Sequence, residues 1–422
     1  MKLFSGHRGQ VIYCPFGVST LDLHQTYRNS SQIIMNKLKQ TLSAVTGLLF
    51  ATSTMAVPSV VPNAPTVNAT AYVLMDYQTG QILAEENAYE KRAPASLTKM
   101  MTSYVLGQEV AQGNVALTDN VKISKKAWSK NFPDSSKMFI EVGKEVKLED
   151  LNRGMVIQSG NDACVAIAEH VAGSEGAFTD LMNAWTAQLG MVDTHFVNAH
   201  GLDSTEHFTT AYDMALLGQA LIRDVPEEYA LYSEKEFTFN KIRQHNRNGL
   251  LWDRSLGVDG IKTGHTSNAG YSLVASAERG GMRLVSVVMG AKSASSREAE
   301  SKKLLNYGFR FFETVTPYKA GDEFISHKIW YGSEPQVSLG VLEDTPVTIY
   351  RGQAEKLEAN FELTEELKAP LTKGQVVGKV FFQLDGKDIA EYKLVALQDV
   401  EEGSWFSKLI DYIKLLVASW FN

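Results

Sequence analysis

The order of apolar and polar residues predicts a mixed helix and strand domain at residues 57–318. Apolar side chains spaced three and four apart predict a helix that follows Pro94 and further helices at residues 148–157, 162–171, 212–223 and 296–312. Short apolar runs bounded by turn residues predict strands at residues 71–77, 81–85, 237–241, 258–265, 270–277 and 282–289. The last two join at Gly280-Gly281, so they form an antiparallel meander with the strand before them.

The pattern changes near Pro317. Up to about Leu397 the chain consists of short alternating runs separated by Gly and Pro turns, and long helical periodicity is absent. Such runs include residues 336–342, 347–350 and 376–384. They predict a small all-β domain at residues 319–402, in which no motif that carries chemistry is visible.

The last segment of the chain, residues 403–422, has the pattern of an amphipathic helix with aromatic residues at both ends. Trp, Phe, Leu, Ile and Tyr gather on one side, and the other side carries Ser404, Lys408, Asp411, Lys414 and Ser419. The segment is too polar to span a membrane, but the pattern suits a helix lying in a membrane interface. The alternative is a terminal helix docked on the protein's own core, and we favour the membrane.

The N-terminal region contains a pattern typical of a secretory signal. Residues 1–34 are mixed and polar, Met35 opens a basic stretch, and residues 42–50 form a short apolar core. Small residues at positions 54 and 56 predict cleavage after Ala56. Since such a signal normally starts a chain, we interpret Met35 as the true start and residues 1–34 as a mis-called upstream extension; the alternative is a genuine long extension.

Composition narrows the function classes. A length of 422 residues suffices for two or three domains. The net charge of −7 argues against a nucleic-acid partner. The two cysteines are Cys14 and Cys164, and loss of the extension would leave Cys164 alone on an apolar helical face. The exported chain would then have neither an intrachain disulfide nor a cysteine metal cluster.

The first candidate for chemistry is Ser96-Leu97-Thr98-Lys99, at the start of the helix after Pro94. Ser96 and Lys99 share a neighbouring helix face, and free backbone N–H groups at a helix start favour developing negative charge. A serine needs a base to become nucleophilic, and a lysine can be that base only if burial or nearby positive charge lowers its pKa. The alternative is a helix cap and a solvated lysine.

Two further motifs follow along the chain. Ser159-Gly160-Asn161 breaks the pattern between two helices, where Gly160 permits a sharp bend; its side chains either cap a helix or project into a cleft. In Lys262-Thr263-Gly264, the lysine faces the opposite side of a strand from the threonine. Gly264 has no side chain, so a ligand can approach the backbone there.

The three motifs stand in a distinctive order, with 63 residues from Ser96 to Ser159 and 101 from Asn161 to Lys262. The chain thereby resembles the penicillin-recognising serine acyltransferases. His265-Thr266, the trailing β domain and the terminal helix narrow the resemblance to low-molecular-mass penicillin-binding proteins of Gram-negative bacteria that act as serine-type D-alanyl-D-alanine carboxypeptidases. It covers residues 35–422 and implies an α+β, β-lactamase/transpeptidase-like domain of antiparallel sheet flanked by helices.

The resemblance implies a role for each catalytic position. Ser96 attacks the carbonyl between the two terminal D-alanines of a peptidoglycan stem peptide, and Lys99, as a neutral amine, takes its proton. Lys262 keeps the site positive, which helps to lower the pKa of Lys99, and attracts the substrate's carboxylate. The backbone N–H groups of Ser96 and His265 form the oxyanion hole, and Ser159 relays a proton to the leaving D-alanine.

The resemblance also implies how substrate is held. Asn161 binds the substrate's amide, Arg247 is a further candidate for the carboxylate, and His200 is interpreted as structural. The residues implied to bind substrate are Asn161, Lys262, Thr263, Gly264, His265 and Arg247. Neither a metal nor a cofactor is implied.

The expected partners are peptidoglycan stem peptides, β-lactam antibiotics that acylate the same serine, and the inner-membrane surface at the periplasmic face. Two other functions remain open from the sequence. A class A-like β-lactamase would have Asp where this chain has Gly160, and it would lack the β domain. A non-catalytic peptidoglycan-binding protein would not need the intact motif residues.

Overall fold

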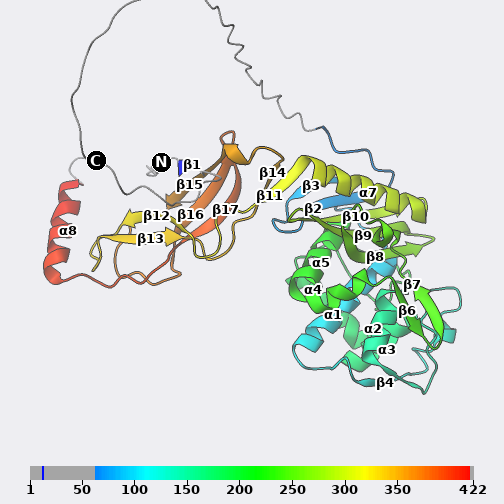
Figure 1. The fold of residues 1–422 in the computed structure, drawn as a ribbon. Helices are drawn as coiled ribbons and strands as arrows, with labels where there is room; N and C mark the ends of the chain where they lie inside the picture. Colours follow the sequence, from blue (N-terminus) through cyan, green and yellow to red (C-terminus); the bar gives the residue numbers. More distant parts are fainter. Residues whose placement is uncertain (1–11, 14–61, 419–422) are drawn as a thin grey trace, which may run out of the picture.

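The computed structural model describes residues 12–13 and 62–418 (Figure 1). The expected signal peptide at residues 35–56, nearly all of the expected extension, and the aromatic residues Trp420 and Phe421 lie outside the described residues.

Strands from the two ends of the first domain meet in one five-stranded antiparallel sheet of order β3-β2-β10-β9-β8. The predicted meander and the predicted hairpin before the Ser96 helix are both present, and they join where β2 pairs with β10. The strands are β2 (Ala71–Asp76), β3 (Ile82–Glu86), β8 (Val258–Thr266), β9 (Gly270–Arg279) and β10 (Met282–Ala291).

This sheet is covered on both faces, as β2 shows. Val73 and Met75 pack into the cluster that holds the helical part of the domain, whereas Leu74 packs into a second cluster with side chains of α7 (Ala294–Phe311). Side chains of a strand alternate between its faces, so a strand buried on both sides is apolar throughout. The sheet therefore separates α7 from the other helices of the first domain (Figure 1).

The helix that carries the serine motif, α1 (Thr98–Ala111), is the centre of the helical part. The sequence pattern predicted a one-sided apolar stripe, but every residue from Thr98 to Gly107 is buried. Five helices and β8 contact α1, so no face of this stretch is left for solvent. The neighbouring helices are α2 (Leu148–Val156), α3 (Asn161–Ala172), α4 (Glu175–Gln188), α5 (Ala211–Asp224) and α6 (Pro226–Ala230).

Some elements were not predicted from the sequence. They include α4, α6 and several short strands, each too short or too weakly patterned to stand out. The minor strand pairs in this domain are β4 (Asn120–Lys122) with β5 (Glu145–Lys147) and β6 (Glu236–Phe239) with β7 (Ile242–His245).

The second domain is a six-stranded sheet with its own apolar core, of order β1-β15-β16-β17-β13-β12. Its edge strand β1 belongs to the N-terminal region and pairs with Glu358 and Ala359. The strands are β1 (Ile12–Tyr13), β12 (Glu323–Lys328), β13 (Gln336–Gly340), β15 (Leu357–Leu363), β16 (Val376–Leu384) and β17 (Lys387–Ala396).

The two domains are joined without a free linker. Helix α7 ends directly at β11 (Phe312–Val315), which pairs with β14 (Val347–Tyr350). The Thr314 hydroxyl donates to Asp76 Oδ2 on β2 at 2.6 Å, so the connecting strands are fixed to the catalytic sheet. This pair begins before residue 319, where the sequence pattern placed the start of the second domain.

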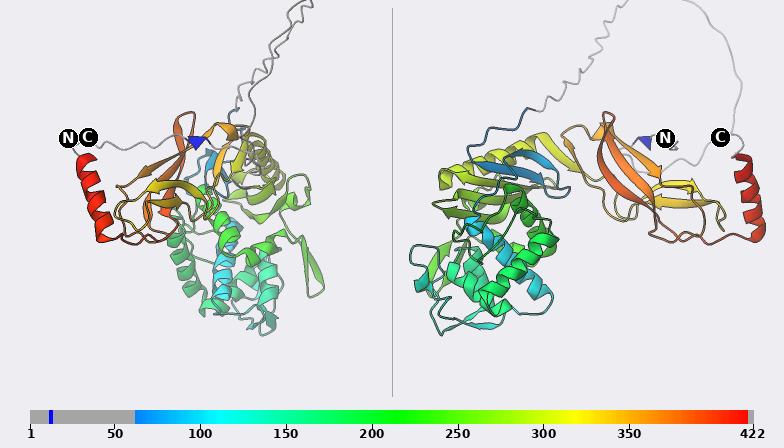
Figure 2. Two further views of the ribbon diagram at one scale, coloured as in Figure 1. Left: turned by 60° about the vertical axis from the view of Figure 1, so that its left-hand side comes forward. Right: turned by 180° about the vertical axis from the view of Figure 1, so that it is seen from behind.

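The terminal helix α8 (Trp405–Ala418) lies at the end of the β domain farthest from the first domain (Figures 1 and 2). Its partly buried side chains are Ser407, Lys408, Asp411 and Leu415. Asp411 accepts a hydrogen bond from the Tyr331 N–H at 3.0 Å. The apolar side is turned outward, where the exposed large side chains are Trp405, Phe406, Leu409, Ile410, Tyr412, Ile413, Leu416 and Val417. No helix in the described part of the chain is long and apolar enough to cross a membrane.

Candidate active site

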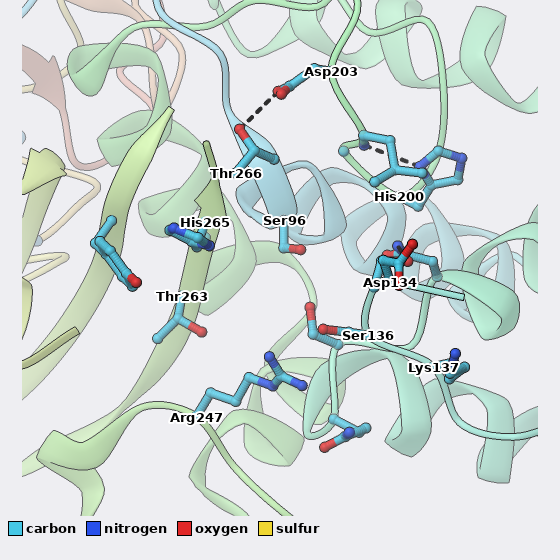
Figure 3. Close-up of a pocket in the computed structure, with 18 of the residues that line it drawn as sticks. Ser96, Asp134, Ser136, Lys137, His200, Asp203, Arg247, Thr263, His265 and Thr266 are labelled. Atoms are coloured by element: carbon cyan, nitrogen blue, oxygen red, sulfur yellow. Dashed lines mark hydrogen bonds between the residues drawn. The ribbon is translucent and has the colours of Figure 1, made fainter. Parts of the chain in front are cut away.

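The three sequence motifs meet at one cavity of about 950 Å³ in the first domain. Ser96, Ser159, Asn161 and Thr263 all line it, although they come from segments far apart in the chain. Figure 3 shows Ser96, Ser136, Thr263 and Arg247 pointing into the same space from different sides.

Ser96 lies in a single 3-10 turn, Ala95–Leu97, that leads directly into α1. Lys99 follows in the first turn of α1, and its Nζ lies 3.1 Å from the Ser96 Oγ. This is hydrogen-bond distance between a nucleophile and a base. The alternative of a solvated surface lysine is wrong, because Lys99 is only 1 % exposed.

The neighbours of Lys99 match the hydrogen-bonding capacity of a neutral amine. Nζ lies 2.7 Å from Asn161 Oδ1 and 2.5 Å from the His200 carbonyl oxygen, and both atoms can only accept. A neutral amine has two N–H donors and one lone pair. In the neutral form, two donors toward Asn161 and His200 leave the lone pair for the Ser96 hydroxyl, so this form of Lys99 can accept the proton of Ser96.

Burial lowers the pKa of Lys99 to about 8, and the positive charge of Arg247 acts in the same direction. Burial is thus the largest cause, ahead of the positive charges around the site. The sequence interpretation had required burial or a nearby positive charge, and it had named Lys262 as that charge. Burial also lowers the pKa of Lys262 well below its usual value, and there Lys99 and Arg247 add to the effect. A substrate carboxylate in the cavity would favour the charged form of Lys262.

The Ser159-Gly160-Asn161 turn connects α2 and α3, as predicted. Ser159 has a φ of 66°, and its buried Oγ has no hydrogen-bond partner among the described residues. Gly160 occupies the N-cap position of α3, and no side chain caps that helix. Asn161 is instead held between Lys99 and the Ser135 hydroxyl, to which its Nδ2 donates at 2.9 Å. The capping alternative for this motif is therefore wrong.

Strand β8 forms the opposite wall. Thr263, Gly264 and His265 line the cavity, and Lys262 lies buried beside them. A Cβ at Gly264 would stand 3.0 Å from the Pro94 carbonyl oxygen. The missing side chain therefore lets β8 lie against the turn that carries Ser96, in addition to leaving the cavity open at this point.

Sequence reasoning missed several residues at the cavity. Arg297 lines it, donates to the Gly264 carbonyl at 3.3 Å and lies over the Tyr271 ring, but a single arginine at a helix start has no motif around it. The main-chain oxygen of His200 contacts Lys99, whereas the sequence analysis assigned this residue only a structural role. A backbone contact leaves no signal in residue type.

Asp162 was also not predicted from the sequence. Its side chain holds the loop in front of the cavity. Its carboxylate accepts hydrogen bonds from the backbone N–H groups of Met138, Phe139 and Ile140.

Within the described ranges, no group of three or more His, Cys, Asp or Glu side chains could hold a metal ion.

Comparison with known proteins gives two family matches. Residues 59–293 match the Peptidase S11 family, described as D-alanyl-D-alanine carboxypeptidase. Residues 312–402 match the C-terminal domain of penicillin-binding protein 5.

Individual relatives are similar over most of the chain. The D-alanyl-D-alanine carboxypeptidase DacA of Escherichia coli K12 is 53 % identical over 395 residues, which is 92 % of this chain and 98 % of that protein. DacC of the same organism is 53 % identical over 378 residues, which is 89 % of this chain and 94 % of DacC. The crystal structure of penicillin-binding protein 5 from Haemophilus influenzae superimposes with a TM-score of 0.79 at 51 % identity and covers 81 % of this chain and all of its own.

Proposed function

The chain belongs to the Peptidase S11 family of D-alanyl-D-alanine carboxypeptidases, and on this premise we propose which of its residues perform the reaction. The chain is a hydrolase of this class and a penicillin-binding protein by its relatives, with the α+β fold and all-β domain expected from the sequence. The observation that supports the assignment best is the contact of a buried Lys99 with Ser96.

In the first step, Ser96 Oγ forms a bond to the carbonyl carbon between the two terminal D-alanines and passes its proton to Lys99. The backbone N–H groups of Ser96 and His265 stabilise the oxyanion. The C–N bond then breaks, and the leaving amine receives a proton from Lys99 through Ser159. The unpartnered Oγ of Ser159 is free for this relay.

In the second step, water attacks the ester carbonyl of the acyl-enzyme, Lys99 removes its proton, and the serine oxygen leaves with a proton. Penicillin acylates Ser96 in the same way as the peptide.

Substrate binding depends on the two walls of the cavity. Asn161 binds the peptide amide, and Lys262, Thr263 and Arg247 attract the terminal carboxylate. Lys262 is buried, so little water screens its attraction for an anion, and the exposed Arg247 adds a second positive charge at the cavity. Gly264 leaves room for the extended peptide beside β8, next to His265.

The test is labelling by penicillin together with release of D-alanine from a D-Ala-D-Ala pentapeptide. Ser96→Ala removes the acylated oxygen and should abolish both signals, and Lys99→Ala should severely reduce acylation while the fold is kept. Acylation of the Lys99→Ala protein at the normal rate would rule out this lysine as the base. Fast steady-state hydrolysis of penicillin would instead favour a β-lactamase. If the unaltered protein were not labelled by penicillin at all, a non-catalytic binding protein would be favoured.

We also propose that the enzyme is exported and acts at the periplasmic face of the inner membrane. Its relatives are cell-wall enzymes, and the basic, apolar and small-residue order at residues 35–56 supports removal of that segment. Residues 57–318 would then be the catalytic domain, residues 319–402 the β domain and residues 403–422 the anchor. N-terminal sequencing of the exported protein should begin at or near Val57, and residues before Met35 in that protein would contradict the proposal.

The outward-facing apolar side of α8 supports attachment to the membrane surface. Had the helix docked on the protein's own core, this side would be covered; instead the side with Lys408 and Asp411 contacts the β domain. Exposed apolar surface of this kind marks an interaction site.

A further inference from the structure

A buried chain of hydrogen bonds ends at the peptide group that carries the Ser96 N–H. It begins at His207, which is 2 % exposed. The Val197 N–H donates to its Nδ1 at 3.0 Å, and Nε2 lies 2.7 Å from the Thr98 Oγ1. The Thr98 hydroxyl in turn lies 2.8 Å from the Ala95 carbonyl oxygen.

The direction of every bond in this chain is fixed. In a neutral imidazole, one ring nitrogen accepts and the other carries the proton. Since Nδ1 accepts from Val197, Nε2–H must donate to the Thr98 oxygen, and the Thr98 hydroxyl must use its own proton on Ala95. Burial lowers the pKa of His207 to about 4, so the ring is neutral at neutral pH.

The Ala95 carbonyl and the Ser96 N–H belong to one planar peptide group. The direction of the carbonyl therefore sets the direction of the N–H that points toward the cavity. The carbonyl needs to be held, because Ala95 has a φ of 49°, an uncommon conformation for a residue with a side chain. Gly201 packs closely against the same carbonyl, and a Cβ there would stand 1.8 Å from the Ala95 oxygen and 2.9 Å from the Thr98 Oγ1.

We propose that His207 and Thr98 are positioning residues that align the Ser96 N–H for the oxyanion, through the Ala95–Ser96 peptide. The proposal rests on the oxyanion hole assigned above. Neither residue is among those that line the cavity. The Thr98 N–H also points at the Ala95 oxygen, so loss of the hydroxyl would loosen the peptide group without releasing it.

The test compares Thr98→Val with Thr98→Ser, which keeps the hydroxyl. A matched control is Thr179→Val, because Thr179 makes the same contact to the carbonyl three residues before it, at 2.8 Å, in α4. Since loss of one oxyanion-hole donor costs about 10²–10³ in rate, a misaligned donor should cost roughly tenfold. We expect Thr98→Val to lower kcat and the acylation rate constant by about this factor with little change in KM. Thr98→Ser and Thr179→Val should stay near the unaltered enzyme.

A purely structural role would not change the infrared spectrum of the acyl-enzyme. In the penicilloyl-enzyme, the ester carbonyl stretch should move to higher wavenumber in Thr98→Val, because the carbonyl receives a weaker hydrogen bond. His207→Gln should shift the band less than His207→Leu, because its amide can still donate. If His207→Leu or His207→Gln does not fold, the comparison of Thr98→Val with Thr98→Ser decides.

A normal kcat together with an unmoved carbonyl band in Thr98→Val would overturn the proposal. The labelling of Ser96→Ala separates this result from failure of the assigned function. If Ser96→Ala loses its label while Thr98→Val behaves normally, the serine mechanism stands and the alignment role alone is wrong.

Discussion

The Lys99 amine lies 2.7 Å from the Asn161 Oδ1, so the first two motifs of the sequence are joined by a buried hydrogen bond. Asn161 begins α3, and Lys99 lies one turn from Ser96 in α1. The contact uses a donor of the lysine and thereby directs its lone pair toward the serine. In the proposed mechanism, the protonation state of this buried amine therefore controls acylation.

The first prediction concerns pH. With the pKa of Lys99 near 8, only about a tenth of the free enzyme carries the neutral base at pH 7. We expect the rate constant for acylation by penicillin to rise with pH and to level off above about pH 8.5. Stopped-flow labelling between pH 6 and pH 9.5 measures it, and a flat or falling profile would be inconsistent with a lysine base.

A lysine at the mouth of the same cavity provides the control. Lys137 donates to the carbonyl oxygens of Phe132 and Pro133, and replacing it by Ala should leave the inflection in place. Lys99→Arg should remove activity, since an arginine cannot lose its proton in this range.

The second prediction concerns Glu228, a fully buried carboxyl that receives hydrogen bonds from Ser103 at 2.5 Å and Asn152 at 2.6 Å. Burial raises its pKa from 4.5 to about 7. The folded protein then binds more protons than the unfolded chain between these values, so stability falls as pH rises from about 4.5 to 7 and is constant above. At pH 8, the raised pKa of Glu228 therefore lowers the free energy of unfolding by about 3 kcal/mol.

Glu228→Gln should remove that dependence. Its free energy of unfolding in urea should change less between pH 5 and pH 8 than that of the unaltered protein. An identical pH dependence in the two proteins would show that Glu228 is ionised already at pH 5.

The third prediction concerns Gly201. It has a φ of 92°, and a side chain there would meet the Ala95 carbonyl. Gly173 also has a positive φ, of 76°, but nothing lies within 4 Å of its Cβ position. Gly173→Ala should cost about 1 kcal/mol of stability for the backbone alone. Gly201→Ala should cost at least about 2 kcal/mol more and slow acylation; equal costs, measured by urea unfolding, would mean that the contact is unimportant.

The fourth prediction is that deletion of residues 404–422 releases a soluble enzyme with normal turnover of a small pentapeptide. The helix lies at the end of the β domain farthest from the first domain (Figure 2), and the first domain holds the cavity. Membrane binding would come from the apolar side of the helix and from attraction of Lys408 and Lys414 to anionic lipid. Both lysines have a carboxylate partner, since Lys408 pairs with Glu402 and the Lys414 Nζ lies 3.7 Å from the Asp411 Oδ1. Fractionation and D-alanine release on both proteins measure this.

Retention of the truncated protein on the membrane would place the attachment elsewhere. A soluble but inactive truncated protein would mean that α8 supports the fold of the enzyme.

The sequence by itself determined the motifs, their order and the elements that carry them. Ser96 stands at a helix start, Ser159 at a turn between helices, and Lys262 on a strand of an antiparallel meander, as the local patterns predicted. Periodicity and turn residues act over a few positions, so one sequence contains this information. The amphipathic pattern of α8 was visible for the same reason.

Only the tertiary structure decided how these groups act on one another. The pKa of Lys99 depends on burial by elements more than fifty residues away, and the apolar stripe of α1 did not reveal that the helix is buried on every side. The His200 carbonyl, Arg297 and the path from His207 to the Ser96 peptide are contacts between segments that packing brings together. Backbone direction and desolvation are properties of the folded neighbourhood, and no single residue type encodes them.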